Sequence, residues 1–419
     1  MTVRFRMPQL DGLRLPTFIT GAAWIYGGQM VRGGFTLIVA AVGARLLSVQ
    51  DYGLFSFTIS FFSWVALLVE GGVATSSARL ISLTERREWD GLMSAFATIF
   101  MLLAGSAAIA ITLGAGPLAR LFGLPVETIL RVCAVPGIGI MWLTSLRILL
   151  PAVDRPRLIA YLEAAPWIIT TAALCTVGLW LRSALAFSFF FTLANLVSGL
   201  WVVFSIARIR RPEGAEIRKT LHQMRIFGFA MYGARLVSTG GFIMDVPLLA
   251  LFLHDTRLVA YYSMSKSLAA PLAIVGQSIS TALFRKFAAS DRVDRKVMIL
   301  VLASTLALAA AYVVASPLVV AVVLPKTYAP IVPYLLIWVA TMTFQSLYQP
   351  PMMFLQAHGR GRSLALLSFL FGLTAVVGYA TLIPRLQVTG ACLAALMAVL
   401  VWTAGSWLIY LRYRGAIRA

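Results

Sequence analysis

The sequence is dominated by apolar runs, each about as long as a helix that crosses a bilayer. Such a helix needs about 20 mostly apolar residues to cross a hydrocarbon core of about 30 Å. The runs are continuous and not alternating, and lipid offers backbone groups no partners, so we expect helices and not a barrel. The predicted spans are residues 17–44, 53–78, 92–114, 128–150, 158–180, 183–207, 224–253, 258–284, 297–321, 329–355, 363–383 and 388–411.

Charge supports a membrane protein and predicts its orientation. Only 12% of the 419 residues are charged, whereas a soluble domain uses about a quarter. The net charge of +20 suggests nucleic-acid binding only if the chain is soluble. Here 24 Lys and Arg residues fall in the two terminal segments and the loops after even-numbered spans, against six in the other loops. By the positive-inside rule both termini are cytoplasmic, and no nucleic-acid partner is expected.

The chain divides into two similar halves. The stretch 26–35 in the first span, YGGQMVRGGF, resembles 232–242 in the seventh, YGARLVSTGGF. We therefore predict an all-α membrane protein with two parallel six-helix repeats, since each half has an even number of spans. The expected units are residues 1–207 and 224–419, joined by a basic cytoplasmic linker, residues 208–223, for which solvated chain is favoured over an amphipathic surface helix.

Five basic residues lie inside predicted spans. Arg131 and Arg147 are within about a turn of a span end and are expected to snorkel to the interface. For Arg147, beside the polar Thr144 and Ser145, lining of a cytoplasmic mouth is the alternative. Arg32, Arg235 and Lys266 lie deeper, in spans 1, 7 and 8. A charge at that depth is costly and is by default a functional candidate. A cavity that brings these three cations together is suited to a multivalent anion.

Acidic residues inside the spans are fewer. Glu70, Asp245 and Glu163 lie in spans 2, 7 and 5. Glu70 and Asp245 are candidate salt-bridge partners of the deep cations, with Arg235 and Asp245 as one possible pair. Coupling to H⁺ or Na⁺ through either carboxylate is a further possibility.

Signatures of an enzyme are missing from the sequence. It has no Gly-rich phosphate loop, no His-Glu-x-x-His and no paired cysteines. We expect no catalytic residues, no metal site and no cofactor. Because two such repeats meet at a cleft, and clefts between repeats are where transporters bind substrate, we expect a transporter and not an enzyme.

Three segments resemble a known family. Residues 43–56, GARLLSVQDYGLFS, are similar to the first-loop pattern of polysaccharide flippases in the multidrug/oligosaccharidyl-lipid/polysaccharide (MOP) exporter superfamily. Residues 261–287, from YYS to LFRKF, and residues 323–328, VLPKTY, resemble their second-half patterns.

The resemblance implies a flippase of the O-antigen (Wzx) type in the bacterial inner membrane. Such proteins move an undecaprenyl-diphosphate-linked oligosaccharide between leaflets, and spans 1, 2, 7 and 8 form their cavity. The diphosphate is then the expected ligand of Arg32, Arg235 and Lys266, and polysaccharide polymerase machinery is a possible partner. The chain lacks the two extra spans of the lipid II flippase branch, which makes peptidoglycan precursor a less favoured substrate.

Two alternatives remain open. A cation-coupled multidrug or toxic-compound exporter of the same superfamily shares the twelve spans, but its cavity is usually acidic. A membrane-embedded polysaccharide polymerase or ligase normally carries a large periplasmic loop, whereas all six predicted outer loops are short.

Overall fold

A computed structural model describes residues 15–153, 155–176, 179–206, 210–283, 287 and 290–418. Every regular element in these residues is helical. The longer helices are α1 (Leu15–Leu46), α2 (Val49–Glu70), α3 (Val73–Leu83), α4 (Trp89–Phe122), α5 (Glu127–Val153), α6 (Pro156–Thr176), α7 (Ala184–Ile206), α12 (Thr256–Ala269), α13 (Pro271–Ala282), α15 (Arg295–Val323), α16 (Val332–Leu347) and α18 (Gly361–Arg418). Shorter elements are η1 (Arg86–Glu88), α8 (Gly214–Gln223), η2 (Met224–Gly228), α9 (Phe229–Arg235), η3 (Leu236–Gly240), α10 (Gly241–Ile243), α11 (Asp245–Leu253), η4 (Lys326–Ile331) and α17 (Gln349–Ala357).

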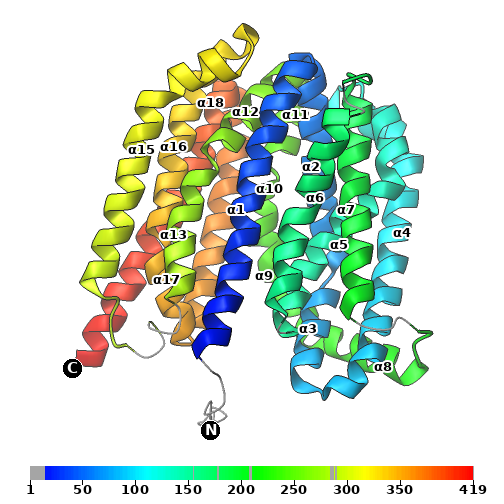
Figure 1. Cartoon of the computed structure of the whole chain (residues 1–419), viewed down its shortest axis with the longest axis vertical. Coiled ribbons are helices and arrows are strands. Elements are labelled where there is room, and N and C mark those ends of the chain that lie inside the picture. The colour runs from blue at the N-terminus through cyan, green and yellow to red at the C-terminus, as the bar shows by residue number, and fades with distance from the viewer. Residues whose placement is uncertain are drawn as a thin grey trace.

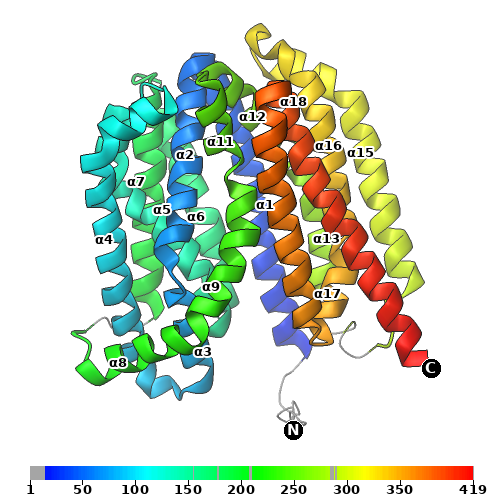
Figure 2. The ribbon, with the colours of Figure 1, turned by 180° about the vertical axis from the view of Figure 1, so that it is seen from behind.

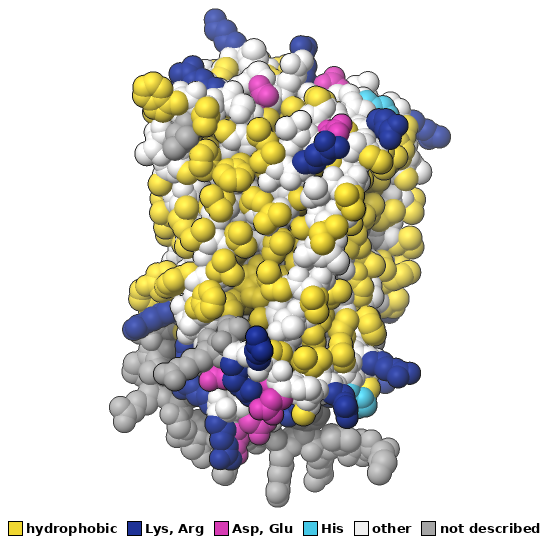
Figure 3. Space-filling model, turned by 90° about the vertical axis from the view of Figure 1, so that its right-hand side faces the viewer, with side chains coloured by type: hydrophobic (Ala, Val, Ile, Leu, Met, Phe, Trp, Pro, Cys, Tyr) yellow, Lys and Arg dark blue, Asp and Glu magenta, His cyan; other side chains and the backbone are white. Residues whose placement is uncertain are grey.

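The long helices stand side by side in one bundle (Figures 1 and 2). Both ends of the described chain lie at the same end of this bundle, which we call the terminal end, and the opposite one is the distal end. Charged side chains gather towards the two ends and apolar side chains cover the middle of the face seen in Figure 3. This distribution fits a protein that crosses a bilayer along the long axis of the bundle.

Ten helices of the described residues are long and apolar enough to span a membrane, or eleven if one bent pair counts as a span. The last of the ten, Gly361–Arg414, contains two predicted spans. They meet at Gln387, whose φ of 51° and ψ of −128° are not helical. The predicted span 224–253 is a chain of short α and π segments from η2 to α11. The all-helical prediction is confirmed, while the two repeats and the cytoplasmic termini stay predictions.

Several predicted spans are broken by identifiable residues. Gly71 and Gly72, with φ of 51° and 84°, separate α2 from α3. A Cβ on Gly72 would lie 2.6 Å from the carbonyl carbon of Gly228, so only glycine lets the start of α3 approach η2 this closely. Pro271 stands at the first turn of α13, where the missing N–H costs nothing.

The predicted solvated linker contains a packed helix, which corrects that expectation. Helix α8 begins with a capping box in which Glu213 and Glu216 each bond the other's backbone. The Arg210 guanidinium also pairs with Glu216, and α8 packs against α3 and α4. Capping and these contacts give the segment a defined place at the terminal end.

The two predicted halves touch closely at the distal end. There α2 packs against α12, and a Cβ on Gly53 would lie 1.9 Å from the Thr256 carbonyl oxygen. The Arg45 guanidinium donates to the Val323 carbonyl oxygen across 2.9 Å, linking α1 to α15. We call the contacts of Arg45 and Gly53 with α15 and α12 the distal seal.

Candidate functional site

A cavity of about 290 Å³ lies between helices of the two predicted halves. Its walls are mainly apolar and hydroxyl side chains, and Lys266 is the charged residue among those that line it. The cavity draws on α1, α2, α6, α11, α12 and α16, with the residues Thr36, Val39, Ala40, Tyr52, Phe55, Ser56, Ile59, Ser60, Trp167, Val246, Ser263, Lys266, Ser267, Ala270 and Met342.

Lys266 contacts a buried carboxylate and two aromatic rings. Its ammonium pairs with Oδ2 of Asp245, which is 2% exposed. The Tyr262 hydroxyl donates to the same oxygen at 2.8 Å. The rings of Phe242 and Trp338 have centroids 5.4 Å from the Lys266 nitrogen, a separation at which cation–π attraction contributes. The lysine side chain stays 30% exposed, so its charge is accessible from the cavity.

Arg32 belongs to a second cluster, shared with two helices of the N-terminal half. Arg32 Nη1 lies 2.6 Å from Oε2 of Glu163, and Arg147 Nε lies 2.9 Å from the other oxygen, Oε1. Glu163 is 9% exposed, whereas the side chains of Arg32 and Arg147 are 34% and 39% exposed. One buried carboxylate therefore joins two guanidiniums, and each guanidinium keeps an accessible face. We call these three residues the arginine triad.

Close helix packing positions the arginine triad. A Cβ on Gly28 would lie 2.6 Å from the Cα of Ala160, so α1 and α6 touch backbone to backbone one turn from Arg32 and Glu163. Glu163 stands seven residues after the start of α6, which is about 10 Å along the axis at 1.5 Å per residue. The triad thus lies inside the bundle but towards the terminal end, where α5 passes into α6.

Arg235 forms a third, looser pair. Its Nη1 lies 3.6 Å from Oε2 of Glu70, whose side chain is fully buried. Neither atom has a hydrogen-bond partner, while Oε1 of Glu70 accepts from the backbone N–H and the hydroxyl of Thr75 at 3.3 Å each. Arg235 stands where α9 passes into the π segment η3. The pair is therefore looser than the other two, but the burial of the Glu70 carboxylate makes its complete separation costly.

The structure distributes the predicted cations over three clusters, each with its own carboxylate. Arg235 pairs with Glu70 and not with Asp245, which belongs to Lys266. Among the described residues, Arg32 and Arg235 have different ion-pair partners, and no shared partner links the two arginines. Binding of a substrate by these three residues stays a prediction.

Arg147 is paired with Glu163 on the neighbouring helix while its side chain stays 39% exposed, so the expectation that it snorkels to the interface stays a prediction. The sequence places Glu163 inside a predicted span, but no partner was predicted for it. Its spacing from Arg147 nevertheless indicates that the two residues meet. Arg147 and Glu163 are almost equally far from the connection at Arg155, so antiparallel neighbouring helices bring them to the same depth. The contact with Arg32, 131 residues away, had no such signal. Arg131, by contrast, forms an exposed pair with Glu127, one turn away on α5.

Charge is not balanced equally among the clusters. The pairs of Lys266 with Asp245 and of Arg235 with Glu70 are formally neutral, whereas the arginine triad carries one excess positive charge. The described residues contain no group of three His, Cys, Asp or Glu side chains that suits a metal ion. Among the described residues the three clusters together therefore carry one net positive charge.

Comparison with known proteins was made for sequence and for fold. Residues 18–288 match a family described as polysaccharide biosynthesis protein. No curated protein sequence gives a significant match. Among solved structures, the lipid II flippase MurJ in an inward closed conformation is similar, with a TM-score of 0.73, 14% identity, and coverage of 93% of this chain and 87% of that one.

Two further structures share the fold over nearly the whole of both chains. An inward-facing multidrug resistance MATE family transporter of the MOP superfamily has a TM-score of 0.62 and 13% identity, covering 98% of this chain and 97% of that one. A MOP superfamily transporter from Pyrococcus furiosus, described as having a binding pocket of reverse polarity, has a TM-score of 0.56 and 13% identity, with 96% coverage of each.

Proposed function

Because the chain belongs to the polysaccharide biosynthesis protein family and has the fold of the MOP superfamily, we propose that it is a flippase for a polyprenyl-diphosphate-linked oligosaccharide. The substrate is an O-antigen or exopolysaccharide repeat unit on undecaprenyl diphosphate. It moves from the inner to the outer leaflet of the bacterial inner membrane. The observation that carries the proposal is the arginine triad, with its excess positive charge near the terminal end.

The arginine triad suits the first contact with a diphosphate. Phosphate oxygens accept paired hydrogen bonds from a guanidinium fork, and such charge-assisted bonds are about twice as strong as neutral ones. Arg32 and Arg147 each have an accessible face, and their shared carboxylate is buried behind them. If the terminal end is cytoplasmic, as the loop charges predict, the triad lies in the leaflet where the lipid-linked precursor is made.

Lys266 and Arg235 then serve deeper stages of the passage. Lys266 faces the cavity between the halves, and Arg235, whose side chain is 28% exposed, is only loosely paired with Glu70. A diphosphate that passes from Arg32 to these cations exchanges one set of charge-assisted bonds for another. The sugars occupy the cavity and its hydroxyl groups, while the polyprenyl chain stays in lipid.

Transport proceeds by rocking of the two halves about the cavity. The distal seal closes one end, and its opening releases the glycan on that side. H⁺ or Na⁺ binding at Asp245 or Glu70 would weaken the pairing with Lys266 or Arg235 and couple a gradient to the movement. Handing the glycan to polymerase machinery is the expected next step.

The shared fold also supports a second candidate, a multidrug exporter of the MATE type. A site for cationic drugs needs a carboxylate that is free to attract them. In the described spans, Glu70, Glu163 and Asp245 are each paired with a basic side chain. This pairing favours an anionic over a cationic substrate.

The test is binding of a defined lipid to the purified full-length protein. The probe is undecaprenyl-diphosphate-linked N-acetylglucosamine, and neutral undecaprenol is the chain-only comparison. We expect Arg32→Gln and Lys266→Gln each to weaken binding of the probe about tenfold or more, since a hydrogen bond to a charged group contributes about 1.5–3 kcal/mol.

The matched control is Arg131→Gln, which removes an equal charge from an exposed pair. It is expected to bind like the unchanged protein. Equal affinity for undecaprenol and the diphosphate probe, or tight binding of ethidium in preference to both, would overturn the proposal.

A further inference from the structure

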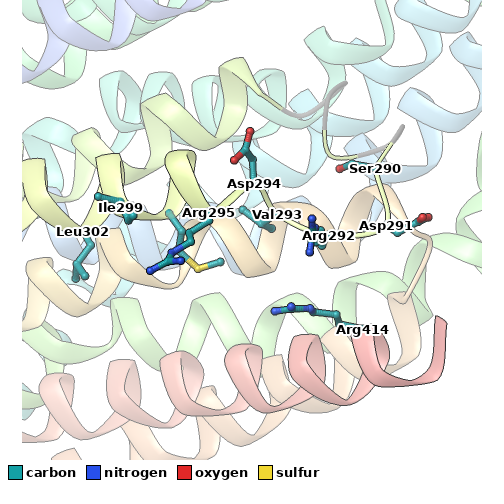
Figure 4. A pocket seen from close by; sticks show the side chains of 10 residues that line it. Ser290, Asp291, Arg292, Val293, Asp294, Arg295, Ile299, Leu302 and Arg414 are labelled. Atoms are coloured by element: carbon teal, nitrogen blue, oxygen red, sulfur yellow. The ribbon is translucent and has the colours of Figure 1, made fainter. Parts of the chain in front are cut away.

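A second large cavity lies at the terminal end, apart from the one that holds Lys266. It has a volume of about 1140 Å³ and is formed by the segment leading into α15 and by the end of α18. Drug-sized ligands occupy pockets of about 300–1,000 Å³, so its size suits a larger ligand. Three arginines line it: Arg292 and Arg295 on one side and Arg414 on the other (Figure 4).

The three arginines have no ion-pair partner among the described residues. Two aspartates also line the cavity, Asp291 and Asp294. The Asp294 carboxylate is engaged as the cap of α15, where it accepts from the Lys296 N–H at 2.9 Å. Figure 4 shows it pointing away from Arg414. Among the described residues that line the cavity, three arginines and two aspartates leave one net positive charge.

The packing beneath the cavity holds the two sides together. The backbone N–H of Val293 donates to the Tyr410 hydroxyl at 3.1 Å, a buried bond between the α15 entry and α18. Both residues belong to a compact apolar cluster with Phe287 and Phe354. Because Arg292 is next to Val293, and Arg414 is one turn beyond Tyr410, this anchor fixes the spacing of the arginines.

An apolar path leads from the arginines towards the middle of the bundle. Ile299 and Leu302 line the same cavity and are 53% and 45% exposed. They follow Arg295 by four and seven residues, which places all three on one face of α15. Leu306, 48% exposed, extends this face. The distance from Arg295 to Leu302 is about 10 Å along the helix, comparable to the step from headgroup to acyl chains.

We propose that this cavity binds an anionic phospholipid, with the phosphodiester on Arg292, Arg295 and Arg414 and an acyl chain along Ile299 and Leu302. Basic pockets between spans at a cytoplasmic surface attract anionic headgroups, and guanidinium forks match phosphate oxygens. A soluble phosphate uses only the arginines, whereas the exposed apolar face beside them calls for a ligand with chains. The site is independent of the glycan route, since its residues are not those of the arginine triad or of the central cavity.

The test is native mass spectrometry of the full-length protein with equal amounts of dioleoylphosphatidylglycerol and dioleoylphosphatidylcholine. The unchanged protein is expected to retain phosphatidylglycerol preferentially. The triple variant Arg292→Gln, Arg295→Gln, Arg414→Gln is expected to lose about 100-fold of that preference, from a contribution of about fivefold per basic residue at an anionic surface.

The control variant removes the same charge elsewhere at the terminal end: Arg86→Gln, Arg87→Gln, Arg211→Gln. It should keep the preference of the unchanged protein. The inference is overturned if both triple variants lose the preference equally, or if neither does. If the triple variant does not insert, the single variant Arg414→Gln is compared with Arg211→Gln in the same way.

A separate arm distinguishes a lipid from a soluble phosphate. sn-Glycerol 3-phosphate carries the phosphate without acyl chains. At the same concentration it is expected to leave bound phosphatidylglycerol in place. Equal competition by glycerol phosphate would make the cavity a site for soluble phosphates and overturn the lipid assignment.

Discussion

Replacing Gly53 by alanine is expected to open the distal seal. The added Cβ would lie 1.9 Å from the Thr256 carbonyl oxygen and 2.7 Å from its carbon, and both are backbone atoms that cannot rotate away. Ordinary contact begins at 3.4 Å, so α2 and α12 have to separate by about 1.5 Å.

The cost falls on the closed arrangement alone. Overpacking costs about 1–3 kcal/mol, whereas alanine gains about 1 kcal/mol over glycine in any helix, open or closed. A bias of about 1–3 kcal/mol corresponds to a shift of about 5- to 150-fold towards conformations in which the seal is open.

Spin labels at Leu121 on α4 and Val322 on α15 report this shift, because both side chains are exposed near the distal end. The exposed Cys175 is first replaced by serine. Double electron–electron resonance is expected to show longer distances between the labels in Gly53→Ala. The control is Gly105→Ala on α4, where an added Cβ meets nothing within 4 Å. An unchanged distance distribution in a folded Gly53→Ala variant would refute the reasoning.

Two predictions concern the stability of the folded protein. Glu163→Gln leaves two guanidiniums without their shared carboxylate and should destabilise the protein by about 1–3 kcal/mol. This is below the full cost of breaking a buried pair, because both arginines are partly exposed. Glu127→Gln, in an exposed pair, should change the stability by less than about 1 kcal/mol. Gly72→Ala places a Cβ at a φ of 84° and should cost about 1–2 kcal/mol from backbone strain alone. Unfolding half-lives in detergent measure both, and a Glu163→Gln variant as stable as Glu127→Gln would contradict the first.

The family and the helical fold were predictable because they depend on local signals. Each span is visible as a run of apolar residues, and the resemblance of residues 43–56 to MOP flippases agrees with the family match and the shared fold. The predicted polysaccharide family and the predicted fold are thereby confirmed. The breaks at Gly71 and Gly72 were less visible, because glycine in an apolar run suits either close packing or a bend.

The pairing of charges was only partly predictable, because it depends on contacts between distant helices. Position within an apolar run indicates how deep a residue lies in the membrane. This depth identified Arg32, Arg235 and Lys266 from the sequence. Which carboxylate each one meets is set by how the helices pack. The sequence also shows more basic than acidic residues inside the spans. It does not show that the extra positive charge belongs to the cluster of Arg32 and Glu163.

The most direct test of flippase activity is a transbilayer assay in proteoliposomes. Undecaprenyl-diphosphate-linked N-acetylglucosamine is placed in both leaflets, and its accessibility to an external galactosyltransferase is followed with time. The account predicts that the unchanged protein makes the lipid of the inner leaflet accessible, that Arg131→Gln does the same, and that the triple variant Arg32→Gln, Arg235→Gln, Lys266→Gln does not. Equal rates for the triple variant and the unchanged protein, or no movement of any diphosphate-linked sugar, would contradict it.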